Sequence, residues 1–361
     1  MSIDIKIVMY IYLFICVSLL IYNIVYIINI QIEKRKQHKH SLFWQNKIKT
    51  QLNYLKNHHQ IEVTHHKLLT KKLIKTKELL AFIEALENLK NDQLFNKYIE
   101  EIYVNWQFLA LKYAKKDNMN KAFFAYVIAT YPPKSKNEFS LIIQILLSYF
   151  NDSTIYCREN VLKALYALGN VQAVENALQI INDNHWFHHQ KLLADGLSKF
   201  NGDKEKLMAK LWSHLNDWDE NIMVSIVQFI NQCNGPYQEI FLPILQSNQT
   251  QLEIRLAIIR YYRRHIYPPA KTILHTFLDD HKTNESILIV TAFAIDQYKD
   301  EKTILLLKKC LHHHNWYVRY NAARSLFNLH ISLESLQDIL TGKDRFAKEI
   351  IEYIYHGEKQ L

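Results

Sequence analysis

A repeat of about 32 residues runs through the second half of the chain and restricts its possible folds more than any other feature. One series of positions advances by 31 to 33 residues at each step: Arg158, His189, Ile222, Arg255, Ile287 and Arg319. A second series marks the starts of apolar segments and advances by 32 or 33: Val171, Lys204, Tyr237, Pro269, Glu301 and Leu333. Two series in a fixed phase predict a unit of two short helices, and such hairpins bury their apolar faces by stacking.

Few residues in the chain break a helix. Six Gly and six Pro among 361 residues are too few for a sandwich or barrel of many short strands. The long stretches without them favour helices joined by short polar turns. We therefore predict an all-α fold, a right-handed α-solenoid of short helical hairpins preceded by one transmembrane helix.

The last full unit shows the repeat pattern most clearly. Its segment NWYVRYNAARSL, at 315–326, resembles the V-R-x-x-A-A-x-A-L core of the HEAT-repeat family, especially the short form of bacterial and phycobilin-lyase-type proteins. The resemblance covers about residues 150–345. It implies that an Asp about six residues before the Arg ties successive turns together, although His313 stands at that place before Arg319. The residues expected to have such structural roles are Asp152, Arg158, Asp183, Trp186, Arg255, Trp316 and Arg319.

An apolar run at the N-terminus predicts a membrane span. Residues 7–32 contain no charged side chain, and at about 1.5 Å per residue they can cross a hydrocarbon core of roughly 30 Å. A secretory signal peptide would need a shorter apolar region, a basic start and a small-residue cleavage site, which the sequence lacks. We read 7–32 as a transmembrane helix and 1–6 as a short extracytoplasmic segment.

The basic charge is concentrated just after this run. Residues 33–90 contain thirteen Lys or Arg and five Glu, whereas residues 91–361 contain thirty basic and twenty-nine acidic residues. A nucleic-acid-binding solenoid would carry a basic stripe along its length, so we expect no nucleic-acid partner. The cluster predicts a cell-membrane protein with its N-terminus outside and its repeats cytoplasmic, and it can contact anionic headgroups. Its members are Lys34, Arg35, Lys36 and Lys39.

The remaining sequence divides into four regions. We expect a basic helical linker or stalk at 33–90, degenerate capping repeats at 91–150, HEAT-like repeats at 151–345 and a capping helix at 346–361. For 33–90, a stalk, a short coiled coil and the first helices of the solenoid are all open.

One cation–aromatic segment in the repeats is a candidate partner-binding site. It could hold an acidic partner segment or a lipid headgroup, or it could simply end a helix before two prolines. Its residues are Arg260, Tyr261, Tyr262, Arg263 and Arg264.

Metal, cofactor and catalytic motifs are not evident. The pairs His58/His59 and His65/His66 point to different faces of a helix, and His312–His314 are expected to be solvated, so we expect no metal. Cys16, Cys157, Cys233 and Cys310 form no C-x-x-C pair, which fits a reducing compartment. Without a known catalytic motif, we expect no catalytic residue, no cofactor, no small-molecule substrate and no enzyme activity.

These features predict a membrane-anchored, non-catalytic scaffold whose concave face binds a protein partner at the cytoplasmic side. The resemblance extends to accessory proteins of envelope polysaccharide glycosyltransferases and implies that class of partner. Two alternatives are open. One is a lyase or modifying enzyme, by analogy with the phycobilin-lyase branch. The other is an adaptor that senses pH or metal through the histidines of 33–90.

Overall fold

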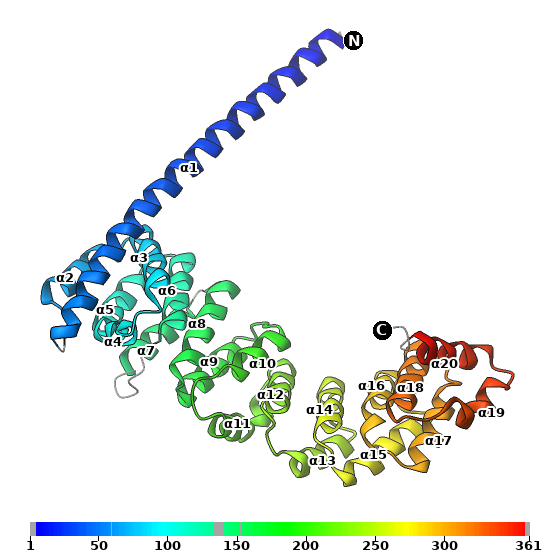
Figure 1. Cartoon of the computed structure of the whole chain (residues 1–361). Coiled ribbons are helices and arrows are strands. Elements are labelled where there is room, and N and C mark those ends of the chain that lie inside the picture. Colours follow the sequence, from blue (N-terminus) through cyan, green and yellow to red (C-terminus); the bar gives the residue numbers. More distant parts are fainter. Residues whose placement is uncertain (1–4, 59, 133–139, 152, 358–361) are drawn as a thin grey trace. The chain divides into compact units, whose positions relative to one another are not determined.

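The computed structural model describes residues 5–58, 60–132, 140–151 and 153–357. All secondary structure in these ranges is helical and none of it is strand, which confirms the predicted all-α fold (Figure 1). The chain divides into two compact units, Met1–Leu168 and Gly169–Leu361, called here the first and second units. Both consist of short helices joined by short turns, apart from the long helix that opens the first unit.

The first unit contains this long helix and seven short ones in its described residues. They are α1 (Ile5–Asn57), α2 (Val63–Lys72), α3 (Thr76–Leu89), α4 (Phe95–Glu101), α5 (Tyr103–Tyr113), α6 (Asn118–Thr130), α7 (Ser140–Ser148) and α8 (Ile155–Leu168). The last part of α1 packs against α3 and α4, α2 packs against α5, and α6 packs against α8.

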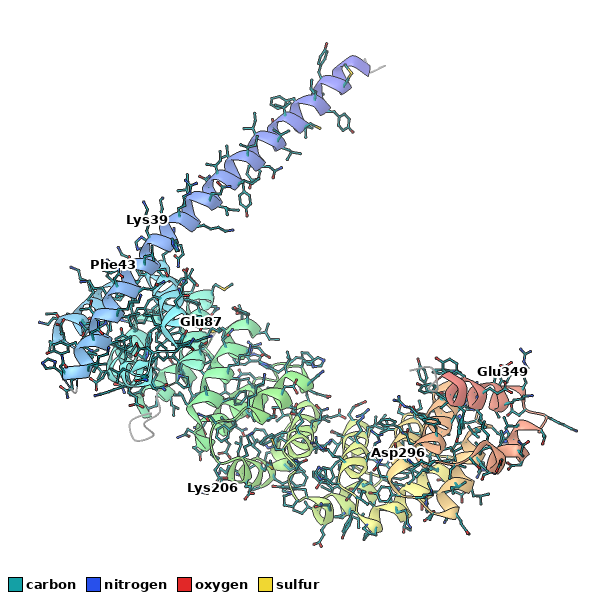
Figure 2. All side chains as sticks on the ribbon, in the orientation of Figure 1. Lys39, Phe43, Glu87, Lys206, Asp296 and Glu349 are labelled. Atoms are coloured by element: carbon teal, nitrogen blue, oxygen red, sulfur yellow. The ribbon has the colours of Figure 1, made fainter. Side chains whose placement is uncertain are left out.

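Helix α1 has two parts with different surroundings. The side chains of its apolar part stand clear of the other helices, and Lys39 and Phe43 mark where the helix reaches them (Figure 2). Beyond that point Trp44, Ile48 and Leu52 are buried on one face, because steps of four residues return to the same side of a helix. Residues 33–90 therefore form neither a separate stalk nor a coiled coil, since the end of α1 joins α2 and α3 in the first folded unit.

Aromatic side chains connect four helices in the core of the first unit. Trp44 of α1 meets Phe82 of α3 edge to face, with ring centroids 5.2 Å apart. Phe82 and Trp106 of α5 are 6.1 Å apart, and Trp106 and Phe124 of α6 are also 6.1 Å apart. All four rings are almost completely buried. Edge-to-face pairs add to the stability that burial provides, so α1 is fixed by packing rather than by the chain connection alone.

The second unit repeats a pair of helices. In chain order its α-helices are α9 (Val171–Asp183), α10 (Gln190–Ser198), α11 (Lys204–Trp212), α12 (Glu220–Gln232), α13 (Gln238–Gln246), α14 (Leu252–Arg264), α15 (Pro268–Asp279), α16 (Glu285–Ala294), α17 (Glu301–Cys310), α18 (Trp316–Asn328), α19 (Gln337–Leu340) and α20 (Arg345–Gly357). Three short 3-10 turns, η1 (Leu215–Asp217), η2 (Ile295–Gln297) and η3 (Leu333–Leu336), lie between them. Helices α10, α12, α14, α16, α18 and α20 each contact the next, and so form one layer of stacked hairpins.

Capping side chains explain why the repeat could be read from the sequence. The predicted starts of the second series agree with the starts of α9, α11, α13, α15, α17 and η3 to within one residue. Asn170, Asp203 and Asp300 stand directly before three of these helices, and their side chains accept hydrogen bonds from backbone N–H groups of the first turn. Such caps satisfy N–H groups that have no partner inside the helix.

Three helices of the second unit end at a residue that has a positive φ angle but is not glycine. His185, Asn234 and His330 adopt positive φ angles of 50°, 57° and 58° after α9, α12 and α18. In each case the N–H of the following residue donates to a carbonyl five residues earlier, at 2.9 to 3.1 Å. This is the Schellman arrangement, in which glycine is the usual residue at the left-handed position.

Candidate docking site and histidine cluster

The apolar part of α1 is the first candidate functional feature. Among the described residues α1 is the one helix long and apolar enough to cross a membrane, with a mean hydropathy of 2.4 and 0% burial in its most apolar window. A signal sequence near the N-terminus would pass the same test of length and composition. The four predicted basic residues Lys34, Arg35, Lys36 and Lys39 are all exposed and lie between this part and the buried face.

The predicted cation–aromatic patch is not one surface. Tyr261 and Tyr262 are 0% exposed. Their hydroxyls donate to backbone carbonyls of the preceding hairpin, Tyr261 to Gly235 at 2.7 Å and Tyr262 to Gln238 at 2.6 Å. They are buried because α14 lies between α12 and α16 and so buries a wide arc of its surface.

Arg263 belongs to a polar link between hairpins. Its Nε and Nη2 donate to the two carboxylate oxygens of Asp296 at 3.0 and 2.8 Å, and the guanidinium lies 3.8 Å from the Phe293 ring. Asn328 of α18 donates to the same carboxylate at 2.9 Å. Burial alone would raise the pKa of Asp296, but these hydrogen bonds hold it below its ordinary value. Only Arg260 and Arg264 of the five predicted residues are exposed.

The repeat arginines Arg158 and Arg319 bind backbone carbonyls. Arg158 donates to the carbonyl of Ser153 at 2.6 Å. Arg319 donates to the carbonyls of His313 and His314 at 2.7 and 3.1 Å. Each arginine thus holds the turn that precedes its own helix, which is a local structural role.

The aspartates and tryptophans to which the resemblance gives structural roles do not share one kind of environment. Asp152 lies outside the described residues. Asp183 accepts from Gln179 at 2.6 Å, while the His189 ring caps α10, so these two residues form no pair. Trp316 is 47% exposed and stacks on Tyr320, and Trp186 is half-buried. The ladder contact implied for Asp183 is therefore not formed with His189.

Arg255 occupies the same repeat position as Arg319 but lacks its acceptors. Both guanidinium groups lie over an aromatic ring, Arg255 at 5.1 Å from Phe277 and Arg319 at 5.3 Å from Phe346, and both bury Nε without a partner. Only Arg319 has carbonyl acceptors for its other nitrogens. Within the ranges that the structure describes, the Arg255 guanidinium has neither a hydrogen bond nor an ion pair, and burial lowers its pKa.

A pocket of about 550 Å³ opens beside Arg255. Its lining comes from the α13–α14 turn, from α14, from α15 and from the residues leading into α16, and it is mainly polar apart from Ile273, Phe277 and Ile287. Asp280 and Lys282 carry the other charges of this lining. An unpaired guanidinium beside such a pocket is a candidate site for an anionic group, because a buried charge is stabilised by a hydrogen-bonding counter-charge.

Histidines of the first unit have structural partners. His65 is buried and forms a hydrogen bond of 2.8 Å with the hydroxyl of Tyr98, and burial lowers its pKa to about 4. His66 forms one of 2.7 Å with Asn105, and His58 stacks on Tyr54. His59 lies outside the described residues. These partners leave His65 and His66 as parts of the core and do not support a sensing role for them.

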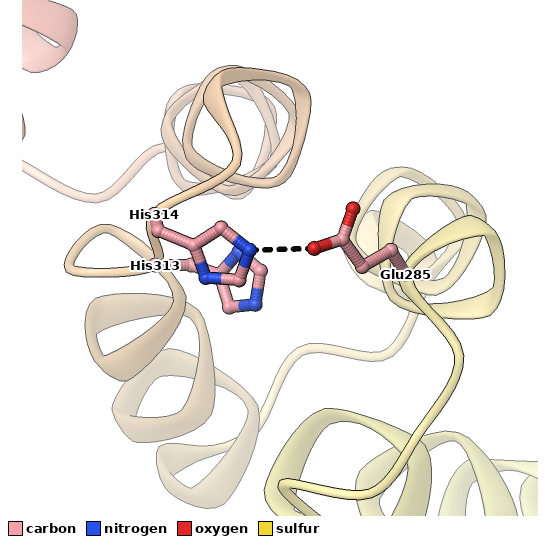
Figure 3. Close-up of side chains that lie close together, drawn as sticks. All are labelled: Glu285, His313 and His314. Carbon is pink, nitrogen blue, oxygen red and sulfur yellow. Dashed lines mark hydrogen bonds and ion pairs between the residues drawn. The ribbon is translucent and has the colours of Figure 1, made fainter.

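The C-terminal histidine run is more organised than the solvated loop that we predicted. His312 pairs with Asp344 at 2.8 Å. His314 pairs with Glu285 at 2.5 Å, and His313 lies beside them (Figure 3). One ligand atom from each of Glu285, His313 and His314 lies within 4.8 Å of the others, so these three side chains could hold a metal ion.

The four cysteines are free. Cys157 and Cys310 are buried, and burial raises the pKa of each thiol, of Cys310 to about 12. A protonated, buried thiol is a poor nucleophile and a poor metal ligand, so these two cysteines belong to the core.

No protein-family model matches the chain, and no curated protein matches it. The HEAT-like resemblance therefore stays a prediction. Among solved structures, the chain is similar to human deoxyhypusine hydroxylase in complex with glycerol. The TM-score is 0.29 and the identity 14%, over 82% of this chain and 97% of that one. That protein is an enzyme, which contradicts our prediction that this chain is not one, and we withdraw that prediction. At this TM-score the likeness assigns no reaction to the chain.

Proposed function

We propose that this protein is a membrane-anchored docking protein whose second unit binds an acidic segment of a partner protein. The observation that carries the docking is Arg255, whose guanidinium faces a pocket without a counter-charge bonded to it. The anchor is the apolar part of α1, and the basic residues after it favour a cytoplasmic position for both folded units. The sequence resemblance suggests an envelope polysaccharide glycosyltransferase system as the source of the partner.

The charges of the pocket fit a carboxylate. Arg255 and Lys282 contribute two positive charges and Asp280 one negative charge, which leaves one positive charge for the ligand to balance. A carboxylate carries one negative charge, whereas a phosphate monoester carries nearly two. A planar guanidinium also matches the two oxygens of a carboxylate. Phe277 beneath the guanidinium fixes its plane, so less side-chain entropy is lost on binding.

A continuous α1 supports an anchor over a removable signal sequence. The helix that contains the apolar part runs without a break to Asn57, and Trp44 and Ile48 are buried in the first unit. Cleavage after the apolar part would leave the basic residues at a new N-terminus, but no small-residue cleavage site precedes them. We expect the full chain to stay in the membrane fraction after alkaline carbonate washing. Release into the supernatant would contradict the anchor without affecting the docking site.

Peptide binding tests the docking site. Full-length protein in detergent micelles is titrated into a fluorescent peptide of alternating Gly and Glu, and into the same peptide with Gln in place of Glu. We expect binding of the Glu peptide only, and an affinity at least about tenfold lower for Arg255→Met, which keeps the stem over Phe277 but removes the charge. The control Arg260→Met removes an exposed charge from the same helix, outside the pocket lining. Equal losses in the two variants would show general charge attraction instead of a site.

A further inference from the structure

We infer that Glu285, His313 and His314 form a binding site for a divalent transition-metal ion, which joins two neighbouring hairpins of the second unit. Glu285 is the first residue of α16, and the two histidines lie in the turn between α17 and α18 (Figure 3). Their ligand atoms lie within 4.8 Å of one another. A single ion in contact with all three would connect residues that are about one repeat apart in the sequence.

The backbone around the three side chains is held in place on both sides. The Asn284 side chain caps α16, which fixes Glu285 in the first turn. On the other side, the Arg319 guanidinium binds the carbonyls of His313 and His314 and so fixes the turn that carries both rings. A metal site gains affinity when its ligands are placed before the ion arrives, because less conformational entropy is lost on binding.

A neighbouring amide orients the carboxylate. The Asn315 side chain donates from Nδ2 to Oε2 of Glu285 at 2.8 Å, which leaves Oε1 to face Nε2 of His314 at 2.5 Å. Such hydrogen bonds to the ligands of a metal are typical of protein metal sites. An ion binding here replaces the hydrogen bond between His314 and Glu285, and its bonds to nitrogen and oxygen move the two atoms apart.

His313 needs the largest rearrangement of the three side chains before it can bind a metal ion. Its Nδ1 accepts a hydrogen bond from the backbone N–H of Asn315 at 3.1 Å, so the proton of the neutral ring is on Nε2. Ligation through Nε2 moves that proton to Nδ1 and gives up the bond to Asn315. His313 is half-buried, and metal binding requires its ring to be unprotonated.

The donor set selects the kind of metal. Two imidazole nitrogens and one carboxylate oxygen suit Zn²⁺, Co²⁺ or Ni²⁺, whereas Mg²⁺ and Ca²⁺ prefer oxygen ligands. Glu285 supplies the anionic ligand, and its carboxylate is held by Asn315 and faces His314. Glu285 and His314 are exposed, so water can complete the coordination.

The test uses full-length protein without a histidine tag, in detergent micelles. Co²⁺ is added and the visible absorption of the bound ion is followed, and Zn²⁺ is then used to displace it. We expect one equivalent to bind, and an affinity at least about tenfold lower in His314→Ala and in Glu285→Gln. The matched control is His312→Ala, because His312 lies in the same run but pairs with Asp344.

Three results would overturn the site. One is unchanged Co²⁺ binding in His314→Ala and Glu285→Gln. Another is an equal loss in His312→Ala, which would show non-specific binding by the histidine run. The third is an affinity that does not fall between pH 7 and pH 5, where ligand histidines become protonated. Far-UV circular dichroism of each variant verifies its folding.

Discussion

The two parts of α1 share one helix but require different surroundings. In the apolar part Leu20 is 61% and Phe14 73% exposed, and apolar side chains occupy all sides of the helix. In the packed part Trp44 and Ile48 are 0% exposed, and polar residues occupy the opposite side. A helix that is apolar all round has no side that suits water, whereas an apolar stripe can be covered by neighbouring helices. The arrangement of apolar residues around the helix therefore decides between membrane and protein surroundings.

The largest effect is expected in the packed part. Replacing Trp44 by Ala removes its contact with Phe82 and its hydrogen bond of 3.0 Å to Glu78. We expect the free energy of unfolding to fall by about 3–5 kcal/mol. The matched variant Leu20→Ala should change it by less than about 0.5 kcal/mol, because the Leu20 side chain is 61% exposed. Urea unfolding followed by far-UV circular dichroism measures both, and similar values for the two would contradict the division of α1.

Acidification should also affect the folded unit and not the apolar part, which has no charged residue. The pKa of His65 is about 4 in the folded state, because the ring is buried, and about 6.5 when unfolded. The unfolded state thus binds more protons between these values. Stability should be complete above pH 6.5 and fall by up to about 3 kcal/mol as the pH is lowered to 4. The test is the free energy of unfolding measured between pH 6.5 and pH 4 in wild type and in His65→Gln. Parallel pH curves for the two proteins would argue against a contribution of His65.

The smallest effect is expected where the two parts meet. Lys77 of α3 pairs with Glu33 of α1 at 3.1 Å, but both side chains are more than half exposed. We expect Lys77→Ala to leave the free energy of unfolding nearly unchanged, since exposed ion pairs are screened by water. The same denaturation measurement applies. A loss comparable to that of Trp44→Ala would mean that charge, not packing, holds α1 to the first unit.

The repeat could be predicted from the sequence because its signals are local. A capping residue such as Asn170 or Asp203 stands before the helix it starts, and the apolar period lies within each helix. The cation–aromatic segment was interpreted wrongly for a physical reason. Which side of α14 faces its neighbours depends on two other hairpins, and these bury Tyr261 and Tyr262.

The histidine cluster was missed for a related reason. Metal ligands are recognisable in a sequence at helix or loop spacing, whereas Glu285 and His314 come from adjacent hairpins and are 29 residues apart. A signal was present in the sequence, because a repeat of about 32 residues brings each helix start close to the turn one hairpin later. Comparing residues one repeat apart would have found this group. The sequence carries no such signal for the lack of an acceptor at the Arg255 guanidinium. Whether this group meets a backbone carbonyl depends on the conformation of the turn before α14.

The unbroken course of α1 over 53 residues has a rotational consequence. An α-helix turns by about 100° for each residue and repeats after about 3.6 residues. The number of residues between the apolar part and Trp44 therefore fixes the azimuth at which the first unit is presented around the anchor axis. One added residue would turn that unit by more than a quarter of a circle, and four would leave it about 40° from its starting direction. The length of the basic segment, as well as its charge, therefore determines the direction in which the first unit faces around the anchor helix.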